Sequence, residues 1–184
     1  TTNNADLDLS GTMTSSDQVA GQIDGSVDFD GIDDEFFGNG ADVNFPSGNT
    51  ARTLEAWVKT TSTCTNCAIV GYGTQVDPQD YALTLNNGQL RLQIRANFLA
   101  FGSTGAVNDG NWHHVVGIRN IDVFSIYVDG VLENSSTLAC GTTYDTAVTD
   151  VIGRYTSGGA YFNGTLDDIR VYSRALTLAE IQAI

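Results

Sequence analysis

The sequence predicts an all-β protein, an antiparallel β-sandwich of the jelly-roll type that ends in a short helix. Three observations lead to this prediction. Short runs of alternating apolar residues recur along the chain, clusters of Gly, Asn and Asp separate them, and helical periodicity is scarce. From residue 23 onward the turn clusters return at intervals of roughly 8 to 12 residues, the spacing expected of a sandwich. A chain of 184 residues is long enough for one such domain, which we place at residues 23–184.

Residues 1–22 differ from the rest of the chain. They are rich in Thr, Ser, Asn and Asp and show little periodicity. Such a composition is typical of a linker or of an edge segment that leads into a domain. We therefore expect residues 1–22 to be a linker or an edge segment of the sandwich.

Two β-hairpins stand out in the middle of the chain. Residues 83–94 alternate apolar and polar side chains around Asn87-Gly88, and residues 124–132 do the same around Asp129-Gly130. Asn-Gly and Asp-Gly pairs are strong short-range signals for a hairpin turn. Alternation places every second residue on one face, so the sequence predicts a buried and a polar face. The expected buried residues are Leu90, Leu92, Ile94, Phe124, Ile126 and Val128, and the expected polar ones are Arg91, Gln93, Arg95, Ser125 and Tyr127.

The end of the chain carries a helix signal. Thr177 and Glu180 match the S/T-x-x-E capping box, and Ile181 and Ile184 follow. We predict a short helix here, which closes the chain as a lid on one edge of the sandwich.

The composition argues against two classes of function and favours a third. The chain has 22 acidic and 8 basic residues, a net charge of −14, which repels polyanions and argues against binding to nucleic acid. No apolar run approaches the roughly 18 to 20 residues that span a bilayer, which argues against membrane insertion. Eighteen of the acids are Asp and four are Glu. Asp suits turns and the oxygen-rich sites that bind divalent cations.

The three cysteines are Cys64, Cys67 and Cys140. A redox C-x-x-C motif needs a βαβ context, and a zinc site needs further Cys or His nearby. The sequence shows neither. We expect a disulfide between Cys64 and Cys67, with a bridge from either of them to Cys140 as the alternative.

Five sequence motifs carry a resemblance to a known family. They are residues 27–34 (VDFDGIDD), 53–59 (TLEAWVK), 111–116 (NWHHVV), 126–132 (IYVDGVL) and 162–172 (FNGTLDDIRVY). In this order they resemble the motifs of bacterial laminin-G-like domains, which have the concanavalin A-like jelly-roll fold, and the resemblance covers about residues 25–184. It implies an extracellular module, secreted or on the cell surface, but this fold hosts lectins, carbohydrate-binding modules, adhesin segments and protein-binding domains alike.

The resemblance, taken together with the chemistry of the aspartates, predicts a calcium site. In such domains the first and last strands lie side by side, which would bring residues 30–31 next to residues 162–164. Asp167 shares parity with Ile169 and Val171, so its carboxylate is expected on the buried face, where a charge is costly unless it is paired or coordinated. Calcium meets this need with about six to eight oxygen ligands. The preferred ligands are Asp30 and Asp167, followed by Asp33 and Asp168, whereas the alternative is an Asp that caps backbone amides or pairs with Arg154 or Arg170.

The sequence offers two surfaces for a ligand. One is the polar sheet face with Arg91, Gln93, Arg95, His113 and Tyr127. The other is a set of glycine-rich loops that carry aromatic and amide side chains, namely Tyr72, Asn97, Phe98, Tyr155 and Tyr161. Trp57 and Trp112 are expected to fill the core. Of His113 and His114, which point to opposite sides of a strand, one is expected to be buried with a hydrogen bond and the other exposed.

Catalytic residues are not evident. The four glutamates do not form the paired spacing of glycosidases, and no serine, zinc or cysteine protease motif is present. We therefore expect a calcium-dependent, carbohydrate-binding module that is not an enzyme. It would be a monomeric module of a larger multidomain adhesin or polysaccharide-degrading enzyme, and its partner would be a neutral glycan or polysaccharide. The alternatives are a protein-interaction or spacer module with structural calcium, and a hydrolase or lyase that uses an Asp pair.

Overall fold

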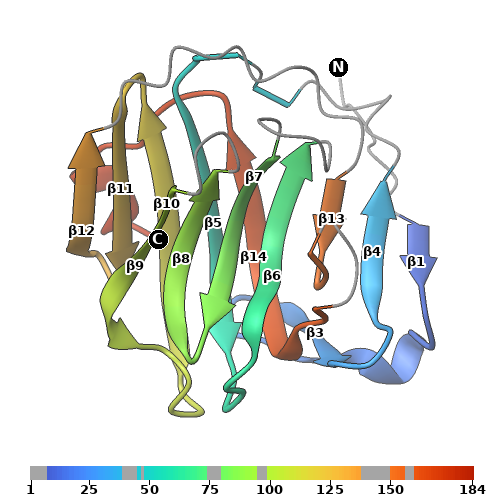
Figure 1. Ribbon diagram of the computed structural model, residues 1–184. Coiled ribbons are helices and arrows are strands. Elements are labelled where there is room, and N and C mark those ends of the chain that lie inside the picture. The colour runs from blue at the N-terminus through green and yellow to red at the C-terminus, as the bar shows by residue number, and fades with distance from the viewer. Residues whose placement is uncertain are drawn as a thin grey trace.

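The computed structural model describes residues 8–38, 45–46, 48–73, 80–94, 99–137, 150–155 and 160–184. Within these ranges, two antiparallel sheets pack face to face, and one short α-helix lies outside them (Figure 1). The predicted antiparallel β-sandwich with a short C-terminal helix is confirmed.

The first sheet, sheet A, has seven strands in the order β1-β4-β13-β6-β7-β8-β9. Sheet B has the order β12-β11-β10-β5-β14-β3-β2. The strands of sheet A are β1 (Asp8–Ser10), β4 (Glu35–Gly38), β13 (Asp150–Ile152), β6 (Thr65–Gly73), β7 (Asp80–Asn86), β8 (Gln89–Ile94) and β9 (Leu99–Ala106). Those of sheet B are β12 (Val131–Thr137), β11 (Val123–Val128), β10 (Trp112–Asn120), β5 (Arg52–Lys59), β14 (Asn163–Tyr172), β3 (Gly25–Asp30) and β2 (Gln18–Ala20). The helices are η1 (Ser15–Asp17), a 3-10 turn, and α1 (Leu178–Ile181).

The N-terminal segment contributes an edge strand to each sheet. β1 pairs with β4 in sheet A, and β2 pairs with β3 in sheet B. Within the described residues, both strands are the outermost of their sheets on the same side of the sandwich (Figure 1).

Both predicted hairpins form. Asn87-Gly88 joins β7 to β8 and Asp129-Gly130 joins β11 to β12, with positive φ at all four residues. This backbone is the one that two-residue hairpin turns require, and Gly adopts it without strain. The hairpins belong to different sheets, β7–β8 to sheet A and β11–β12 to sheet B.

The main core lies between the sheets. Leu90 and Leu92 are fully buried, as predicted, and they face the inner side chains of sheet B such as Leu54 and Phe124. Burying such side chains contributes roughly 1.5–3 kcal/mol each. The polar face of β8 points outward, away from sheet B.

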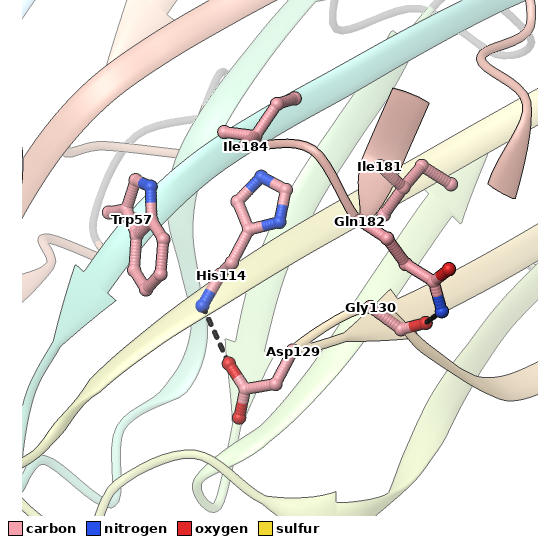
Figure 2. Close-up of a pocket in the computed structure, with 7 residues that line it drawn as sticks. All are labelled: Trp57, His114, Asp129, Gly130, Ile181, Gln182 and Ile184. Atoms are coloured by element: carbon pink, nitrogen blue, oxygen red, sulfur yellow. Dashed lines mark hydrogen bonds between the residues drawn. The ribbon is translucent and has the colours of Figure 1, made fainter. Parts of the chain in front are cut away.

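Helix α1 has the predicted capping box. The Thr177 hydroxyl accepts from the backbone N–H of Glu180, and the Glu180 carboxylate accepts from that of Thr177. The helix does not lie on an edge, however. Its Ile181 packs against Val116 and Ile118, which form an apolar stripe on the outer face of sheet B, so the C-terminal segment covers that face (Figure 2).

Candidate cation site and ligand surfaces

A cluster of three carboxylates lies in the loop between β3 and β4. One oxygen each of Asp30, Asp33 and Asp34 lies within 4.8 Å of the others. Asp30 Oδ1 accepts from the backbone N–H groups of Ile32, at 2.7 Å, and Asp33, at 3.3 Å. An aspartate that accepts from the backbone two and three residues on closes a tight turn, which folds the carboxylates toward one another.

Asp34 is the member of this cluster that has a buried oxygen without a hydrogen-bond partner among the described residues. The residue is 3% exposed. Its Oδ2 accepts from the backbone N–H of Asp30 at 2.9 Å, but its Oδ1 is buried and has no hydrogen-bond partner among the described residues. Burial, together with the neighbouring carboxylates, raises the pKa of Asp34 above its ordinary value. A buried carboxylate oxygen without a partner is costly, and a cation would remove that cost.

Two distant segments hold this loop in place. The backbone N–H and the hydroxyl of Thr12 donate to Asp33 Oδ1 at 3.2 and 2.9 Å. From β14, the side-chain amide of Asn163 donates to the backbone carbonyl of Asp30. Asn163 stands opposite Asp30 in the register of β14 and β3, which confirms that the first and last motifs lie side by side. The loop is therefore fixed from both sides.

Asp167 and Asp168 do not join this cluster. The expectation that Asp167 faces the core with Ile169 and Val171 is wrong, because a β-bulge between Asp167 and Arg170 shifts the register and Asp168 has a φ of +46°. Such a bulge reverses the side on which the following residues point. Asp167 stands opposite Trp57, on the outer side of sheet B.

Both of these carboxylates have partners of their own. Asp167 accepts from the backbone N–H of Ile23 at 2.7 Å, and Asp168 lies 2.7 Å from the Arg170 guanidinium. Of the four predicted metal ligands, the structure therefore brings together Asp30 and Asp33. It adds Asp34, which sequence reasoning left out although it belongs to the same Asp-Asp doublet.

A second cluster of polar groups lies on the outer face of sheet B. Glu55 is 1% exposed, and its Oε1 accepts from Arg170 at 3.2 Å and from the Tyr172 hydroxyl at 2.8 Å. Its Oε2 has no hydrogen-bond partner among the described residues and lies 3.9 Å from His114 Nε2. A charged side chain of the protein itself thus neutralises this buried acid.

The two histidines have opposite environments. His113 lies 2.8 Å from Asp129 and 3.1 Å from Asp109. Burial lowers the pKa of His113, but these carboxylates outweigh it and raise the pKa above its ordinary value. Burial lowers the pKa of His114, whose Nε2 has no hydrogen-bond partner among the described residues. The expectation that one histidine is buried is met by His114, but its Nε2 lacks the expected hydrogen bond, and His113 is half-buried rather than exposed.

The predicted polar sheet face is not one surface. Arg91 and Gln93 lie on the outer face of sheet A, whereas His113 and Tyr127 belong to sheet B, because the two hairpins that suggested the face are in different sheets. Tyr127 packs against the outer cluster of sheet B. The predicted ligand residues Arg95, Asn97 and Phe98 lie outside the described residues.

On the outer face of sheet A the polar groups are held in place. Arg91 donates to the side-chain oxygen of Asn66 at 3.2 Å, and Gln93 donates to the hydroxyl of Tyr155. The segment after β13 therefore reaches across this face as far as β8. Thr84, on β7 directly beside Arg91, has a buried hydroxyl with no hydrogen bond among the described residues.

The predicted loop aromatics differ in exposure. Tyr72 is in the core, where its ring stacks on Phe45 and burial raises its pKa to about 12, so the idea that it lies on a surface loop is wrong. Tyr155 is 8% exposed, and Tyr161 lies under the guanidinium of Arg154. Arg154 in turn makes two hydrogen bonds of 2.8 and 2.9 Å to Glu35. Tyr155 and Tyr161 therefore border the outer face of sheet A.

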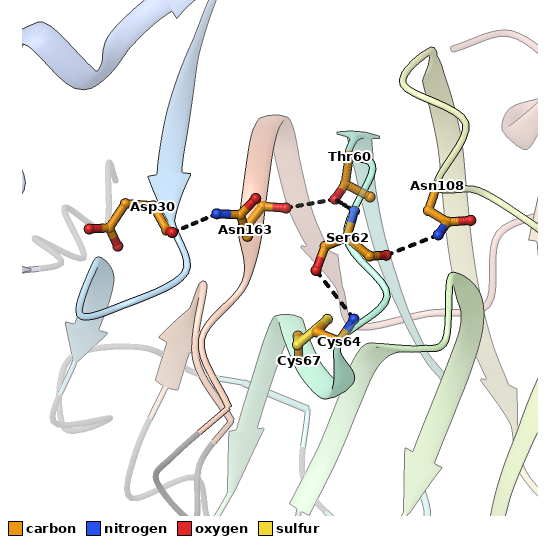
Figure 3. The surroundings of a disulfide bond; sticks show 7 residues. All are labelled: Asp30, Thr60, Ser62, Cys64, Cys67, Asn108 and Asn163. Carbon is orange, nitrogen blue, oxygen red and sulfur yellow. Dashed lines mark hydrogen bonds between the residues drawn. A yellow bond between two sulfur atoms is a disulfide. The ribbon is translucent and has the colours of Figure 1, made fainter.

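The tryptophans and the cysteines complete the predicted set. Trp57 does not fill the core between the sheets, because it alternates with core residues and lies half-buried on the outer face of sheet B beside His114. The predicted disulfide between Cys64 and Cys67 is confirmed (Figure 3). Cys140 lies outside the described residues.

The fold and its motifs agree with a known protein family. The profile described as the concanavalin A-like lectin/glucanases superfamily matches residues 37–182. The chain belongs to this superfamily. The laminin-G-like resemblance read from the motifs is thereby confirmed, whereas no curated protein matches the chain significantly.

Solved structures share the fold at low sequence identity. The chain resembles the binding domain of Paraclostridial Mosquitocidal Protein 1, with a TM-score of 0.77 and 14% identity over 98% of this chain and 47% of that one. It also resembles domain 4 of AbnA, a GH43 extracellular arabinanase from Geobacillus stearothermophilus, in complex with arabinotriose, with a TM-score of 0.70 and 19% identity over 90% and 79% of the chains. A pentraxin from Limulus polyphemus matches with a TM-score of 0.60 and 20% identity over 75% and 70%.

Other similar structures are receptor-binding domains of botulinum neurotoxins, so the similar structures are mostly binding or receptor-binding domains, although the superfamily also includes glucanases. The chain spans about half the length of the toxin binding domains that it matches. In the described part of the chain, none of the helices is long and apolar enough to cross a membrane.

Proposed function

We propose that this chain is a calcium-dependent carbohydrate-binding module, without catalytic activity, of a larger secreted or cell-surface protein. The observation that carries the proposal is the fold shared with domain 4 of the arabinanase, whose structure holds arabinotriose and of which this chain covers 79%. A module of this kind supplies a shallow surface for a glycan.

The surface that suits a glycan best is the outer face of sheet A. Arg91 and Gln93 present a planar guanidinium and a planar amide there, and hydrogen bonds to Asn66 and Tyr155 fix both of them. Sugars have many hydroxyl groups that donate and accept at once, so pre-positioned planar groups bind them with little loss of side-chain entropy.

Charge favours a neutral glycan. The chain carries −14 overall, so sulfated and uronic-acid polymers are repelled at low salt. Arg91 is the local exception, since it places a positive group on the proposed surface. A shallow site with few strong contacts binds in the micromolar to millimolar range, about −4 to −8 kcal/mol.

The calcium is proposed to sit in the β3–β4 loop. Asp30, Asp33 and Asp34 are its ligands, since their oxygens converge within 4.8 Å and the buried Oδ1 of Asp34 has no other partner. Carboxylate oxygens are the ligands that calcium prefers. The ion would neutralise the buried carboxylate and stiffen the loop that joins the two sheets.

A glycan array probed in calcium and again in chelator tests this function. We expect binding to one or more neutral glycans in calcium, weaker binding in chelator, and loss of binding in Arg91→Ala but not in the control Lys59→Ala, an exposed residue on sheet B. No signal in either buffer would favour the spacer function, and breakdown of a polysaccharide would favour an enzyme.

A further inference from the structure

A pocket of about 240 Å³ lies on the outer face of sheet B, between β5, β10, the β11–β12 turn and the C-terminal segment. Trp57 and His114 form one wall with Ile184 beside the imidazole, Asp129 and Gly130 lie at the turn, and Gln182 lies on the other side (Figure 2). The glycan surface proposed above lies on the other sheet. This pocket is therefore a separate feature of the molecule.

Two nitrogen atoms on the wall of the pocket have no hydrogen-bond partner in the described part of the chain. They are Nε1 of Trp57 and Nε2 of His114, whose side chain is 4% exposed. The two rings lie with centroids 5.2 Å apart. Buried polar atoms are almost always paired, and each exception calls for an explanation such as a missing ligand.

The chemistry of these atoms defines what can satisfy them. The indole N–H of Trp57 can only donate, so it needs an acceptor. The ring of His114 is neutral near pH 7, since burial lowers its pKa, and so one of its nitrogens accepts and the other donates. A hydroxyl group donates and accepts at the same time, whereas an ammonium group offers the indole nothing. The pair therefore selects hydroxyl groups over cations.

The surroundings exclude anions. Asp129 lies at the pocket with its side chain 49% exposed, and Glu55 Oε2 lies 3.9 Å from His114 Nε2. Ile181 and Ile184 supply apolar surface, against which the C–H groups of a sugar ring can pack. At about 30 Å³ per water, the pocket holds roughly eight waters, which is room for one sugar ring.

We infer that this pocket binds a single neutral sugar unit, with its hydroxyl groups on Trp57 Nε1, the His114 ring and the Asp129 carboxylate. Both nitrogens have almost no exposed surface in this structure. Ile184 lies beside the imidazole in Figure 2, so the ligand reaches the nitrogens by displacing that side chain. The class of ligand rests on the proposed function, but the site does not involve sheet A.

The chain has two tryptophans, Trp57 and Trp112, and hence two indole N–H signals in a 15N-correlated NMR spectrum. Trp57→Phe assigns them. Methyl α-L-arabinofuranoside, methyl β-D-galactopyranoside and methyl β-D-glucopyranoside are then titrated separately into the wild type. We expect at least one of them to move the Trp57 signal along a saturable curve, while the Trp112 signal stays in place.

Two variants sharpen this test. His114→Phe keeps an aromatic ring but removes both nitrogens, and it should weaken binding at least tenfold. Ile184→Ala removes the side chain that the ligand displaces and should strengthen binding several-fold, which also guards against misfolding of the first variant. The inference is overturned if none of the three sugars moves the Trp57 signal saturably, or if both variants bind as the wild type does.

The outcome also separates this site from the proposed function. Binding on the glycan array with an unmoved Trp57 signal removes this pocket and leaves the proposed function in place. A blank array with a saturable Trp57 shift keeps the pocket and removes the proposed role of sheet A.

Discussion

The sandwich contains two clusters of acidic residues that differ in how their charge is balanced. On the outer face of sheet B, buried Glu55 accepts from Arg170 and Tyr172. In the β3–β4 loop, Asp34 is equally buried, but its neighbours Asp30 and Asp33 carry the same charge as itself. No lysine or arginine among the described residues forms a salt bridge to this loop.

This difference indicates which buried carboxylate would be stabilised by a bound cation. A buried carboxylate is stable when a cation compensates it, whether that cation is a side chain or an ion. Arg170 provides the compensation for Glu55, and the part of the chain that the structure describes offers the loop no such residue. We therefore expect a divalent cation to change the stability of the domain through this loop. It should have no effect through the Glu55 cluster, which serves as the comparison.

The largest effect is expected from breaking the Glu55 cluster. Arg170→Met should destabilise the domain by about 3 kcal/mol, at the low end for buried ion pairs because the guanidinium is partly in water. Urea unfolding in calcium and in chelator should show the same loss in both. A loss that appears in only one of the two buffers would couple the clusters and contradict their independence.

The second effect is that of calcium on the loop. At a hundredfold excess over its dissociation constant, one bound ion stabilises by about 2.7 kcal/mol, which raises the melting temperature by roughly 5 to 10 °C. Asp34→Asn should remove this shift. Asp167→Ala, which loses only the bond to Ile23, should lower stability by about 1–2 kcal/mol and keep the full calcium shift. An unchanged shift in Asp34→Asn would place the ion elsewhere.

The disulfide tests how far the loop depends on its surroundings. Hydrogen bonds run from Cys64 through Ser62 and Thr60 to Asn163, which holds the carbonyl of Asp30 (Figure 3). The bridge closes a loop with a sequence separation of only 3, so mild reduction should cost less than about 2 kcal/mol and leave the fold intact. Calorimetry of the reduced protein should give the same calcium affinity. A larger loss would point to a bridge that involves Cys140.

The smallest effect concerns the two histidines of β10, of which His114 lies beside the Glu55 cluster and His113 beside Asp109 and Asp129. Because the pKa of His114 is lowered in the folded state, its contribution falls as the pH drops below its ordinary value of 6.5. The pKa of His113 is raised, so its contribution is full below 6.5 and is lost as the pH rises through the folded value. Between pH 5 and 8, His114→Gln should therefore flatten the acid loss of stability, and His113→Gln should deepen it. Unfolding curves of both variants that parallel the wild type would contradict these shifts.

Much of the fold could be predicted from local signals in the sequence. Asn87-Gly88 and Asp129-Gly130 dictate tight turns through their own backbone preferences, and Thr177 with Glu180 defines a helix start. Each of these signals acts within a few residues. They are therefore readable without knowledge of the rest of the structure.

The candidate site could be predicted only in part, because it depends on register and on which sheet each hairpin joins. The bulge at Asp168 turned Asp167 away from the core, and alternation along β14 gave no sign of it. The polar faces of the two hairpins looked alike, but β8 and β11 lie in different sheets. Asp34 could have been named as a candidate ligand, since it adjoins Asp33 in the sequence. Its burial, however, arises from tertiary packing and could not be predicted.

The central claim, that this domain binds neutral glycans, is tested most directly by affinity electrophoresis of the wild type in calcium. Gels cast with arabinan, galactan or a β-glucan should retard the protein in at least one case. Gels cast with alginate or heparin should not retard it when calcium is removed. Unimpeded migration in all three neutral gels, or strong retardation by heparin in chelator, would contradict the account.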